Sequence, residues 1–337
     1  MVQRESSLRM VAWEITRNCN LNCIHCRAAA TQGPYKGELT LSECKNIMDE
    51  ISSFSSPTII LTGGEPLLRD DIFDIILYGK KKGLRLVMAT NGTLLDKAKA
   101  LKMKEGGIKR VSLSLDGKDK RAHDRFRGVD GSFESVMDSA RILKDIDLPF
   151  QINTTVTRLN VDDLEDIYRM VKTINACAWH TFLLVPIGRG EGLKGEELST
   201  KMYEDVLEWL YGIEKKDELE IKVTCAPHYY RIVKEKGDTP KSAGCLAGKS
   251  FMFISHRGIA QPCGYLEVPS GDVRKEGVKK VWEESPVFNR LRDFTSYKGK
   301  CGICRYLKIC GGCRARAYEI KGDILEEEPY CSYKGSE

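Results

Sequence analysis

The chain predicts an α/β fold, a partial (β/α)6 barrel open on one side and followed by a loop-rich C-terminal extension. Six short, β-rich apolar runs alternate with six segments of helical periodicity over the first two-thirds of the 337 residues. Repeated βα units build a parallel sheet covered by helices. Six units are fewer than the eight that close a full barrel, so we expect an opening that admits a bulky substrate.

The elements follow one another in a regular order. Strands are predicted over residues 10–15, 58–61, 85–89, 110–115, 150–156 and 181–185. Helices are predicted over residues 41–51, 72–82, 94–104, 133–144, 164–174 and 203–213. The alternation stops after about residue 220, so we place a domain boundary at residues 217–219. We therefore expect a core domain over residues 8–218 and a second domain over residues 219–337.

The composition argues against several classes of partner. The net charge of +5 is mild and no basic block with interleaved aromatic residues occurs, so nucleic acid is not expected. No run approaches the length of an apolar membrane span, and residues 1–9 lack the apolar core of a signal peptide. These observations predict a cytoplasmic protein without a membrane span, and they are compatible with an anionic small-molecule substrate.

Thirteen cysteines in such a chain indicate metal rather than disulfides, because the cytosol keeps thiols reduced. Cys19, Cys23 and Cys26 form a C-x3-C-x2-C motif directly after the first predicted strand. Three thiolates at this spacing can hold a cubane iron–sulfur cluster, whose usual complement is four cysteines. The iron without a protein ligand is then free to bind a substrate or cofactor. A zinc site with His25 as its fourth ligand is the alternative interpretation.

Polar or glycine-rich motifs follow four of the other predicted strands. They lie at residues 63–66, 90–92, 116–117 and 186–190. Alone, each is more typical of a turn. In parallel βα folds, however, the chemistry sits at the C-terminal ends of the strands. We therefore expect these motifs and the three cysteines to lie on one rim.

The C-x3-C-x2-C loop, together with the Gly-Gly-Glu motif at residues 63–65, resembles the radical S-adenosylmethionine (SAM) superfamily over roughly residues 8–220. The resemblance implies that Cys19, Cys23 and Cys26 hold a [4Fe–4S] cluster whose open iron binds SAM and form the catalytic centre. It further implies that one electron cleaves SAM to methionine and a 5′-deoxyadenosyl radical. That radical abstracts a hydrogen atom from an unactivated carbon.

The same resemblance implies a set of SAM contacts. The residues are Gly63, Gly64, Glu65, Ser114, Asp116, Arg127, Ile187 and Gly188. The Gly-Gly-Glu motif helps to hold the SAM amino group, and the serine and aspartate stand where the family places ribose contacts. The arginine is a candidate partner of the SAM carboxylate, a task that suits a guanidinium fork. The last two residues match the region where backbone contacts the adenine.

The C-terminal region resembles the SPASM extension found on a subset of radical SAM enzymes. The resemblance assigns one auxiliary [4Fe–4S] cluster to Cys301, Cys304, Cys310 and Cys331. It assigns a second to Cys245, Cys263 and Cys313, with Cys225 as our choice of fourth ligand. Without Cys225 this cluster also has an open iron. One departure from the family pattern is a CxxC at residues 310–313 where CxxxC is common. A zinc ribbon is the alternative.

Four runs, at residues 11–17, 26–30, 151–156 and 310–318, are similar to the radical SAM heme b synthases of the siroheme-dependent heme pathway. The similarity implies an iron-porphyrin substrate, iron-coproporphyrin III, and the oxidative decarboxylation of two propionates to the vinyl groups of heme b. It also implies a low-potential electron donor and an electron acceptor. An auxiliary cluster near the substrate is a plausible acceptor of the final electron.

Three other functions stay open. A radical SAM peptide-modifying maturase shares the two-part architecture, but its usual N-terminal recognition domain does not fit before a strand that starts near residue 10. A sister tetrapyrrole enzyme would remove acetate side chains from a siroheme derivative. A non-enzymatic iron–sulfur electron-transfer protein is the third possibility, and it would not cleave SAM.

Further residues are candidates for porphyrin recognition. The cations expected beside the propionates are Arg27, Arg189, Arg314 and Arg316. The candidates for an axial iron ligand are His25, His123, His180, His228 and His256. Two remaining cysteines, Cys44 and Cys177, stand alone and are expected to be buried structural thiols.

Overall fold

A computed structural model describes residues 7–333 of the chain. Two segments lie outside the described residues. They are residues 1–6, part of the N-terminal segment that lacks a signal-peptide pattern, and residues 334–337, the end of the predicted second domain. Among those described, ten strands form one sheet in the order β10-β9-β8-β1-β2-β3-β4-β5-β6-β7. Strands β8 and β1 to β7 run parallel to one another, whereas β9 is antiparallel to both β8 and β10.

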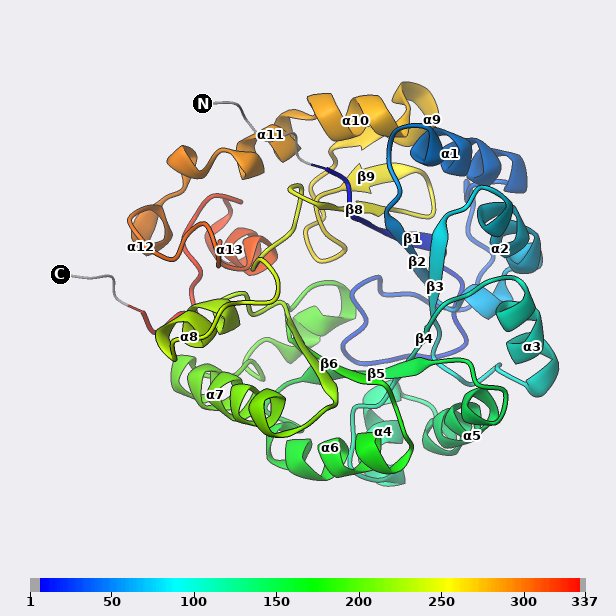
Figure 1. The fold of residues 1–337 in the computed structure, drawn as a ribbon, viewed down its shortest axis with the longest axis horizontal. Helices are drawn as coiled ribbons and strands as arrows, with labels where there is room; N and C mark the ends of the chain where they lie inside the picture. The colour runs from blue at the N-terminus through cyan, green and yellow to red at the C-terminus, as the bar shows by residue number, and fades with distance from the viewer. Residues whose placement is uncertain (1–6, 334–337) are drawn as a thin grey trace.

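The six predicted strands all form, and the core barrel of the prediction is confirmed (Figure 1). They are β1 (Met10–Thr16), β2 (Thr58–Gly63), β3 (Arg85–Ala89), β4 (Val111–Ser114), β5 (Phe150–Val156) and β6 (Ala178–Leu183). The largest displacement is in β6, which begins at Ala178 because its pairing with β5 already starts opposite Gln151. The apolar residues after Leu183 continue into a loop.

The predicted helices cover the outside of the sheet (Figure 1). They are α1 (Leu41–Phe54), α2 (Ile72–Lys81), α3 (Lys97–Glu105), α5 (Ser132–Asp145), α6 (Leu164–Thr173) and α7 (Thr200–Lys216). A capping box of Thr40 and Glu43 starts α1. Helix α3 begins later than predicted, because the Asp96 carboxylate accepts from the Lys99 amide at 2.7 Å and so fixes the first turn.

The two faces of the sheet differ in exposure. On β6, Trp179 packs against rings of α6 and α7 and is fully buried, whereas its neighbour His180 points to the opposite face and is half-buried. The same alternation of buried and half-buried residues runs along β2, β3, β5 and β7. We call the face without the helices the inner face. Its partial exposure shows that the barrel interior is not filled by the side chains of the sheet.

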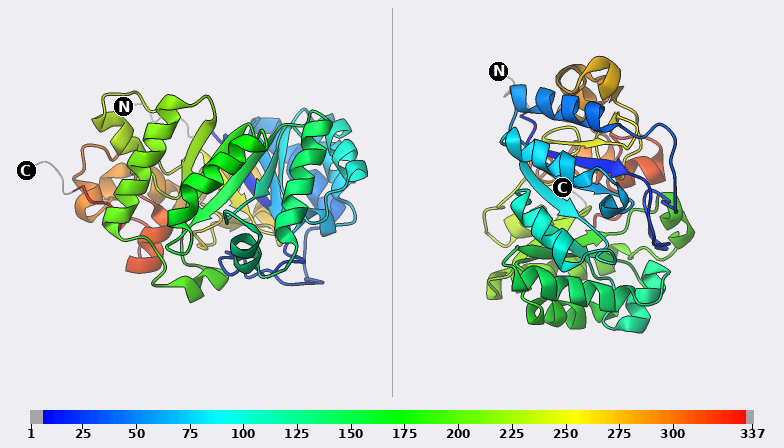
Figure 2. Two further views of the ribbon diagram at one scale, coloured as in Figure 1. Left: turned by 90° about the horizontal axis from the view of Figure 1, so that it is seen from below. Right: turned by 90° about the vertical axis from the view of Figure 1, so that its right-hand side faces the viewer.

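The C-terminal part adds strands to both edges of this sheet. Past the predicted boundary at residues 217–219, β7 (Glu220–Thr224) pairs with β6, and β8 (Phe251–Ile254) pairs with β1. The hairpin of β9 (Ile259–Gln261) and β10 (Gly271–Asp272) follows β8. These four strands were not expected from the sequence. In Figure 2 the C-terminal segments lie beside one end of the core.

Several short helices complete the C-terminal part. They are α8 (Tyr229–Glu235), α9 (Val273–Glu276), α10 (Val278–Glu284), α11 (Pro286–Arg292), α12 (Gly299–Gly302) and α13 (Arg314–Lys321). Long loops join them and carry most of the late cysteines, as the loop-rich prediction requires. Within residues 7–333, none of the helices combines the length and apolar character that crossing a membrane requires.

Candidate active site and cysteine clusters

The first three cysteines lie on one loop at the C-terminal end of β1. Cys19 and Cys23 are buried and Cys26 is half-buried. They share a small apolar cluster with Leu21 and two alanines. The backbone of the loop is itself ordered by hydrogen bonds, since the amide of Cys26 donates to the carbonyl of Cys23 at 3.2 Å. The C-x3-C-x2-C spacing therefore gathers three thiols in one protected place.

The chemistry of these thiols fits iron. Burial, together with the nearby Glu65, Cys23 and Cys26, raises the pKa of Cys19 to about 11. Burial likewise raises the pKa of Cys23. Bare thiolates are thus unfavourable here, whereas metal ions would neutralise their charge and bind them deprotonated. Three buried or half-buried thiols that repel one another when deprotonated fit a cubane cluster.

Glu65 holds the end of β3 against the cysteine loop. Its buried carboxylate accepts from the Thr90 hydroxyl and from the Asn91 amide, each at 2.7 Å. The Asn91 side chain in turn donates to the Cys19 sulfur at 3.9 Å. The segments expected on one rim, residues 63–66 and 90–92, therefore meet at the cluster loop. In this arrangement Glu65 positions that rim, and its predicted contact with the SAM amino group stays a prediction.

The glycines of the Gly-Gly-Glu motif permit a close backbone approach. A Cβ on Gly63 would lie 2.2 Å from the carbonyl oxygen of Thr16, and a Cβ on Gly64 would lie 2.3 Å from that of Asn18. The groups that approach them belong to the chain that leads into Cys19. These glycines therefore let the second strand end directly against the cluster loop.

Asp116 and Arg127 form a buried ion pair on the same rim. The Arg127 guanidinium also donates to the Cys23 sulfur at 3.7 Å, while Asp116 accepts from the Thr155 amide at 2.6 Å. Arg127 therefore joins the loop after β4 to the cysteine loop. Ser114, at the end of β4, is half-buried on the inner face. The SAM contacts predicted for these three residues stay predictions.

The segment after β6 is fastened to the cysteine loop. The guanidinium of Arg189 donates to the carbonyls of Cys23 at 2.9 Å and Ala30 at 2.7 Å. Gly188 has φ +58°, and a Cβ there would lie 2.3 Å from the carbonyl oxygen of Arg27. Ile187, beside it, is buried. The predicted adenine segment thus lies next to the predicted cluster.

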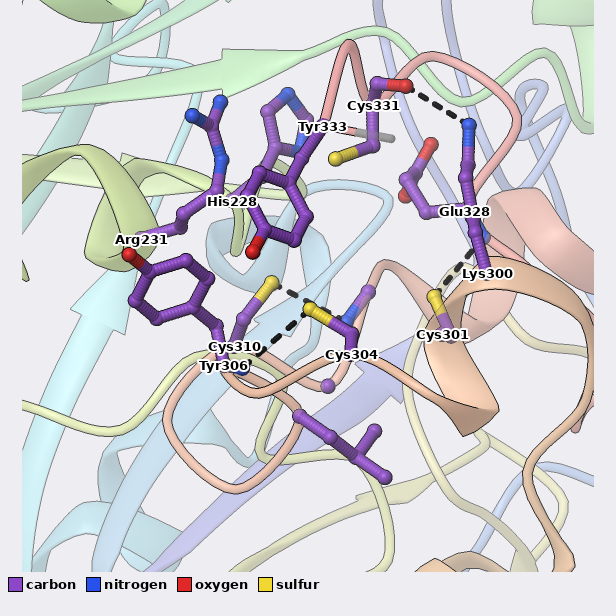
Figure 3. Close-up of a pocket in the computed structure, with 13 residues that line it drawn as sticks. His228, Arg231, Lys300, Cys301, Cys304, Tyr306, Cys310, Glu328, Cys331 and Tyr333 are labelled. Carbon is purple, nitrogen blue, oxygen red and sulfur yellow. Dashed lines mark hydrogen bonds between the residues drawn. The ribbon is translucent and has the colours of Figure 1, made fainter. Parts of the chain in front are cut away.

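A second group of four cysteines lines one pocket in the C-terminal part (Figure 3). They are Cys301, Cys304, Cys310 and Cys331. Hydrogen-bond donors already surround three of these sulfurs. The Glu328 amide donates to Cys301 at 3.3 Å, the Tyr306 amide to Cys304 at 3.4 Å, and the Gly312 amide to Cys310 at 3.5 Å. These are the four residues expected to hold one auxiliary cluster, and N–H donors to sulfur suit such a cluster.

The structure also brings together the other predicted set. The Cys225 thiol donates to the sulfur of Cys313, which lowers the pKa of Cys313 and raises that of Cys225. Cys263 packs in the same small apolar cluster and acts electrostatically on Cys225. Cys245 acts electrostatically on Cys263, and its amide donates to the carbonyl of Cys310 at 2.8 Å. Cys225 thus lies beside Cys313 and Cys263, and its role as the fourth ligand of this set stays a prediction.

This second set lies beside the cluster loop of β1. Arg27, the residue after Cys26, pairs with the buried Glu14 at 3.2 Å and lies 4.5 Å from the ring centroid of Phe253. Its guanidinium reaches the carbonyl of Gly264, directly after Cys263, at 3.5 Å. Contacts through Arg27 thus connect the first cysteine loop to the cysteine at position 263.

Tyr265 occupies the same region and was not singled out from the sequence. Burial raises the pKa of its phenol, and both Cys225 and Cys26 act on it electrostatically. The Tyr265 amide donates to the Cys263 sulfur at 3.4 Å. In the sequence, Tyr265 is marked only by its position two residues after the predicted ligand Cys263. A tyrosine at such a position is too common to indicate a functional residue.

The arginines expected to bind propionates are engaged within the protein. Arg314 and Arg316 are fully buried. Arg314 donates to the carbonyls of residues 312, 324 and 326, and Arg316 pairs with Glu328 at 3.2 Å. Arg27 and Arg189 are held as described above. Arg314 and Arg316 are thus occupied by groups of the protein, whereas Arg27 and Arg189 are only partly buried, and a contact of these two with propionates stays a prediction.

The other candidates separate by environment. Cys44 is buried, as expected, but Cys177 is exposed, and the prediction of a buried thiol was wrong there. Cys177 lies in the turn between α6 and β6, outside the packed face of the sheet. Among the histidines, His256 is paired with Glu14 at 2.7 Å, and His228 lines the four-cysteine pocket. Any axial ligation of iron by a histidine stays a prediction.

Comparisons with known proteins agree with this geometry. Residues 13–171 match the radical SAM superfamily, and residues 245–314 match the SPASM iron–sulfur cluster-binding domain. Among solved structures, SuiB of Streptococcus suis bound to S-adenosylmethionine aligns with a TM-score of 0.77 at 17% identity, covering 97% of this chain and 78% of SuiB. Native anSMEcpe with bound AdoMet aligns with a TM-score of 0.72 at 20% identity, covering 96% of this chain and 94% of that protein. These two likenesses show the fold alone.

The fold and the three-cysteine loop define a radical SAM enzyme with a SPASM extension, whose cofactors are SAM, a [4Fe–4S] cluster and auxiliary iron–sulfur clusters. AdoMet-dependent heme synthase of Methanosarcina barkeri is 45% identical over 99% of this chain and 99% of its own length. AdoMet-dependent heme synthase of Nitratidesulfovibrio vulgaris is 47% identical over 97% of this chain and 92% of its own length. The chain belongs to the family of these heme synthases.

The chain is also similar to a more distant relative with another name. Fe-coproporphyrin III synthase of Methanosarcina barkeri is 28% identical over 96% of this chain and 87% of its own length. The wide gap between this identity and the values of 45% and 47% places the chain with the heme synthases.

Proposed function

We propose that the protein makes heme b from iron-coproporphyrin III by oxidative decarboxylation of two propionates to vinyl groups. The observation that carries this proposal is the identity of 45–47% with AdoMet-dependent heme synthases over nearly the whole chain. The buried, iron-suited thiols and the reducing conditions they require also agree with a cytoplasmic location.

The reaction needs two functions from the protein. Each propionate loses a hydrogen atom from its β-carbon, one electron and CO2, and a vinyl group remains. SAM bound at the cluster of Cys19, Cys23 and Cys26 supplies the radical that takes the hydrogen atom. The residues on the rim hold that loop in place, through Arg127 to Cys23 and through Asn91 to Cys19.

The second function is the removal of the remaining electron. The contacts of Arg27 with Gly264 and the position of Tyr265 bring the cysteine set at 225, 263 and 313 next to the first cysteine loop. An auxiliary cluster held by that set is therefore suited to accept the electron near the substrate. We propose a low-potential donor for the first cluster and a separate acceptor for the electrons that leave.

The test is an anaerobic turnover assay with cluster-reconstituted protein, SAM, a low-potential reductant and iron-coproporphyrin III. We expect heme b, two CO2 per porphyrin and 5′-deoxyadenosine, separated by liquid chromatography and identified by mass. The control is the Cys19→Ala, Cys23→Ala, Cys26→Ala variant, which should form no 5′-deoxyadenosine while keeping its auxiliary iron.

Two outcomes would contradict the proposal. If SAM is cleaved but the porphyrin keeps its four propionates, the substrate assignment fails. If a siroheme derivative loses acetate side chains in a parallel assay while iron-coproporphyrin III is left unchanged, the protein is the sister tetrapyrrole enzyme.

A further inference from the structure

The inner face of the barrel is divided into an apolar and a polar half. One cross-strand row comprises Phe253, Ala12, Ile60 and Val87, which are neighbours on β8, β1, β2 and β3. We call it the apolar row. A second row comprises Ser114, Asn153, His180 and Lys222, which are neighbours on β4, β5, β6 and β7. We call it the polar row.

Three members of the apolar row and all four members of the polar row are partly accessible. Apart from the buried Phe253, every member of the two rows is half-buried, whereas the residues next to them in sequence on the outer face are buried. An apolar wall opposite a polar wall is the lining that suits a ligand with an apolar body and polar groups at its edge. A porphyrin that carries propionates has this distribution of polarity.

The polar row ends in a cation without a partner. Within residues 7–333, no hydrogen bond or ion pair engages the ammonium of Lys222. The nearest acidic neighbour on the same strand, Glu220, is already bonded to Arg110 at 3.1 Å and lies 3.7 Å from His180. Burial lowers the pKa of Lys222, which means that the surroundings disfavour the charged ammonium. A half-buried, unpaired ammonium is unfavourable in a protein unless an anion arrives to balance it.

The neighbours of Lys222 can complete an anion site. His180 and Asn153 precede Lys222 in the polar row. The side-chain nitrogen of Gln151 lies 2.8 Å from the Nδ1 atom of His180 and donates to the Oδ1 atom of Asn153 at 2.9 Å. This network fixes the side chains on either side of a potential ligand. Two of the cations expected from the sequence are unsuitable by comparison, since Arg314 and Arg316 are fully buried and bonded within the protein.

We infer that Lys222 binds a propionate carboxylate of the porphyrin substrate and orients the macrocycle across the inner face, with its apolar part on the apolar row. This inference rests on the proposed function. The same chemistry, a carboxylate, is also present on SAM. The porphyrin is favoured because the apolar row faces the polar one, which a small zwitterionic amino acid group does not require.

The test measures ligand binding rather than turnover. Iron-coproporphyrin III is titrated into cluster-reconstituted protein and followed by its Soret difference spectrum, for wild type, Lys222→Gln, Lys222→Arg and the control Lys201→Gln. Lys201 is an 84% exposed lysine on α7. We expect Lys222→Gln to weaken binding at least about tenfold, the scale of a charge-assisted hydrogen bond. Lys222→Arg should restore most of the affinity, and Lys201→Gln should match wild type.

A second arm distinguishes recognition of charge from damage to the fold. A derivative of the porphyrin with four carboxamides in place of the carboxylates should bind equally well to wild type and to Lys222→Gln. Iron content and calorimetric SAM affinity should also be equal in the two proteins. If Lys222→Gln weakens the amide derivative as much as the acid, or weakens SAM binding alone, the inference is overturned.

The remaining outcomes separate the inference from the proposed function. If wild type binds and decarboxylates iron-coproporphyrin III and Lys222→Gln binds it with unchanged affinity, only the role of Lys222 fails. If wild type neither binds nor decarboxylates the porphyrin, the proposed function fails and the inference falls with it.

Discussion

At the scale of single residues, Cys225 has an unusual backbone. Its φ of +61° lies in the left-handed region, which costs a non-glycine residue about 1–2 kcal/mol. It stands directly after β7, and its thiol contacts the sulfur of Cys313. A requirement for the sulfur to lie at this position, as in a cluster ligand, would explain why the strained conformation is kept.

We predict that Cys225→Ala removes one auxiliary cluster. The iron content of reconstituted protein should fall from about twelve to about eight per chain, since a cubane holds about four irons. Iron and sulfide counting, with electron paramagnetic resonance of the reduced protein, measures this. The control is Cys177→Ala, an exposed cysteine outside both predicted sets, which should retain its full iron content. Because three cysteines alone can hold a cubane, equal iron content would remove Cys225 from the ligand set only together with an unchanged electron paramagnetic resonance spectrum of the reduced protein.

At the scale of elements, the segment after β6 shows how a loop supports the site. The 3-10 helix Gly188–Leu193 begins where the backbone of Gly188 meets the carbonyls of Cys26 and Arg27. Arg189 then ties the same segment to the cysteine loop. The geometry of the first cluster site therefore depends on a segment more than 160 residues away along the chain.

Gly188→Ala is expected to disturb the site that Gly192→Ala leaves intact. The added Cβ at position 188 would lie 2.3 Å from a carbonyl oxygen and would force a side chain to φ +58°, whereas nothing lies within 4 Å of a Cβ at position 192. The left-handed conformation alone costs about 1–2 kcal/mol. Anaerobic thermal unfolding should show a lower melting temperature for Gly188→Ala only, with slower 5′-deoxyadenosine formation. Equal behaviour of the two variants would refute this role of Gly188.

At the scale of the whole molecule, a buried ion pair joins the C-terminal part to the barrel. Arg316 and Glu328 are both essentially inaccessible, with side-chain exposures of 0% and 1%. Arg316 also donates to the carbonyl of Leu184 at 3.2 Å, just past β6, and Glu328 accepts from the amide of Cys313 at 2.7 Å. The pair therefore links the barrel to a loop that carries an expected cluster ligand.

Arg316→Met should destabilise the protein by about 3–5 kcal/mol, because it leaves the Glu328 charge buried without a partner. Arg290→Met breaks a 3.4 Å ion pair with Asp323 in which the arginine side chain is 56% exposed, and it should change the free energy of unfolding by less than about 1 kcal/mol. Anaerobic urea unfolding followed by circular dichroism compares the two. A similar, small effect of both variants would show that the buried pair does not hold the two parts together.

Local patterns predicted most of the core and most of the cysteine sets. Apolar periodicity identified β1 to β6 and their helices, because each element repeats its own spacing of buried residues over a short run of chain. The spacing of Cys19, Cys23 and Cys26 specified a site because one loop carries all three. Strands β9 and β10 escaped prediction because they have only three and two residues. Strands β7 and β8 lie beyond the point where the alternation of strands and helices stops, and β8 is completed only by pairing with β1, far away along the chain.

The sequence by itself determined the class of enzyme and the order of the core elements, because the motifs and the periodicity that carry them depend on residue type and spacing. The assignment of the later cysteines to two clusters came from the resemblance to the SPASM extension and stays a prediction. Tertiary structure decided the partners of individual charges. It turned Arg189 and Arg316 inward to backbone carbonyls, and it placed Lys222 on the inner face without an ion-pair partner among residues 7–333. A charged side chain pairs with whatever the fold places within a few ångströms, and that neighbour is set by strands and loops distant in the chain.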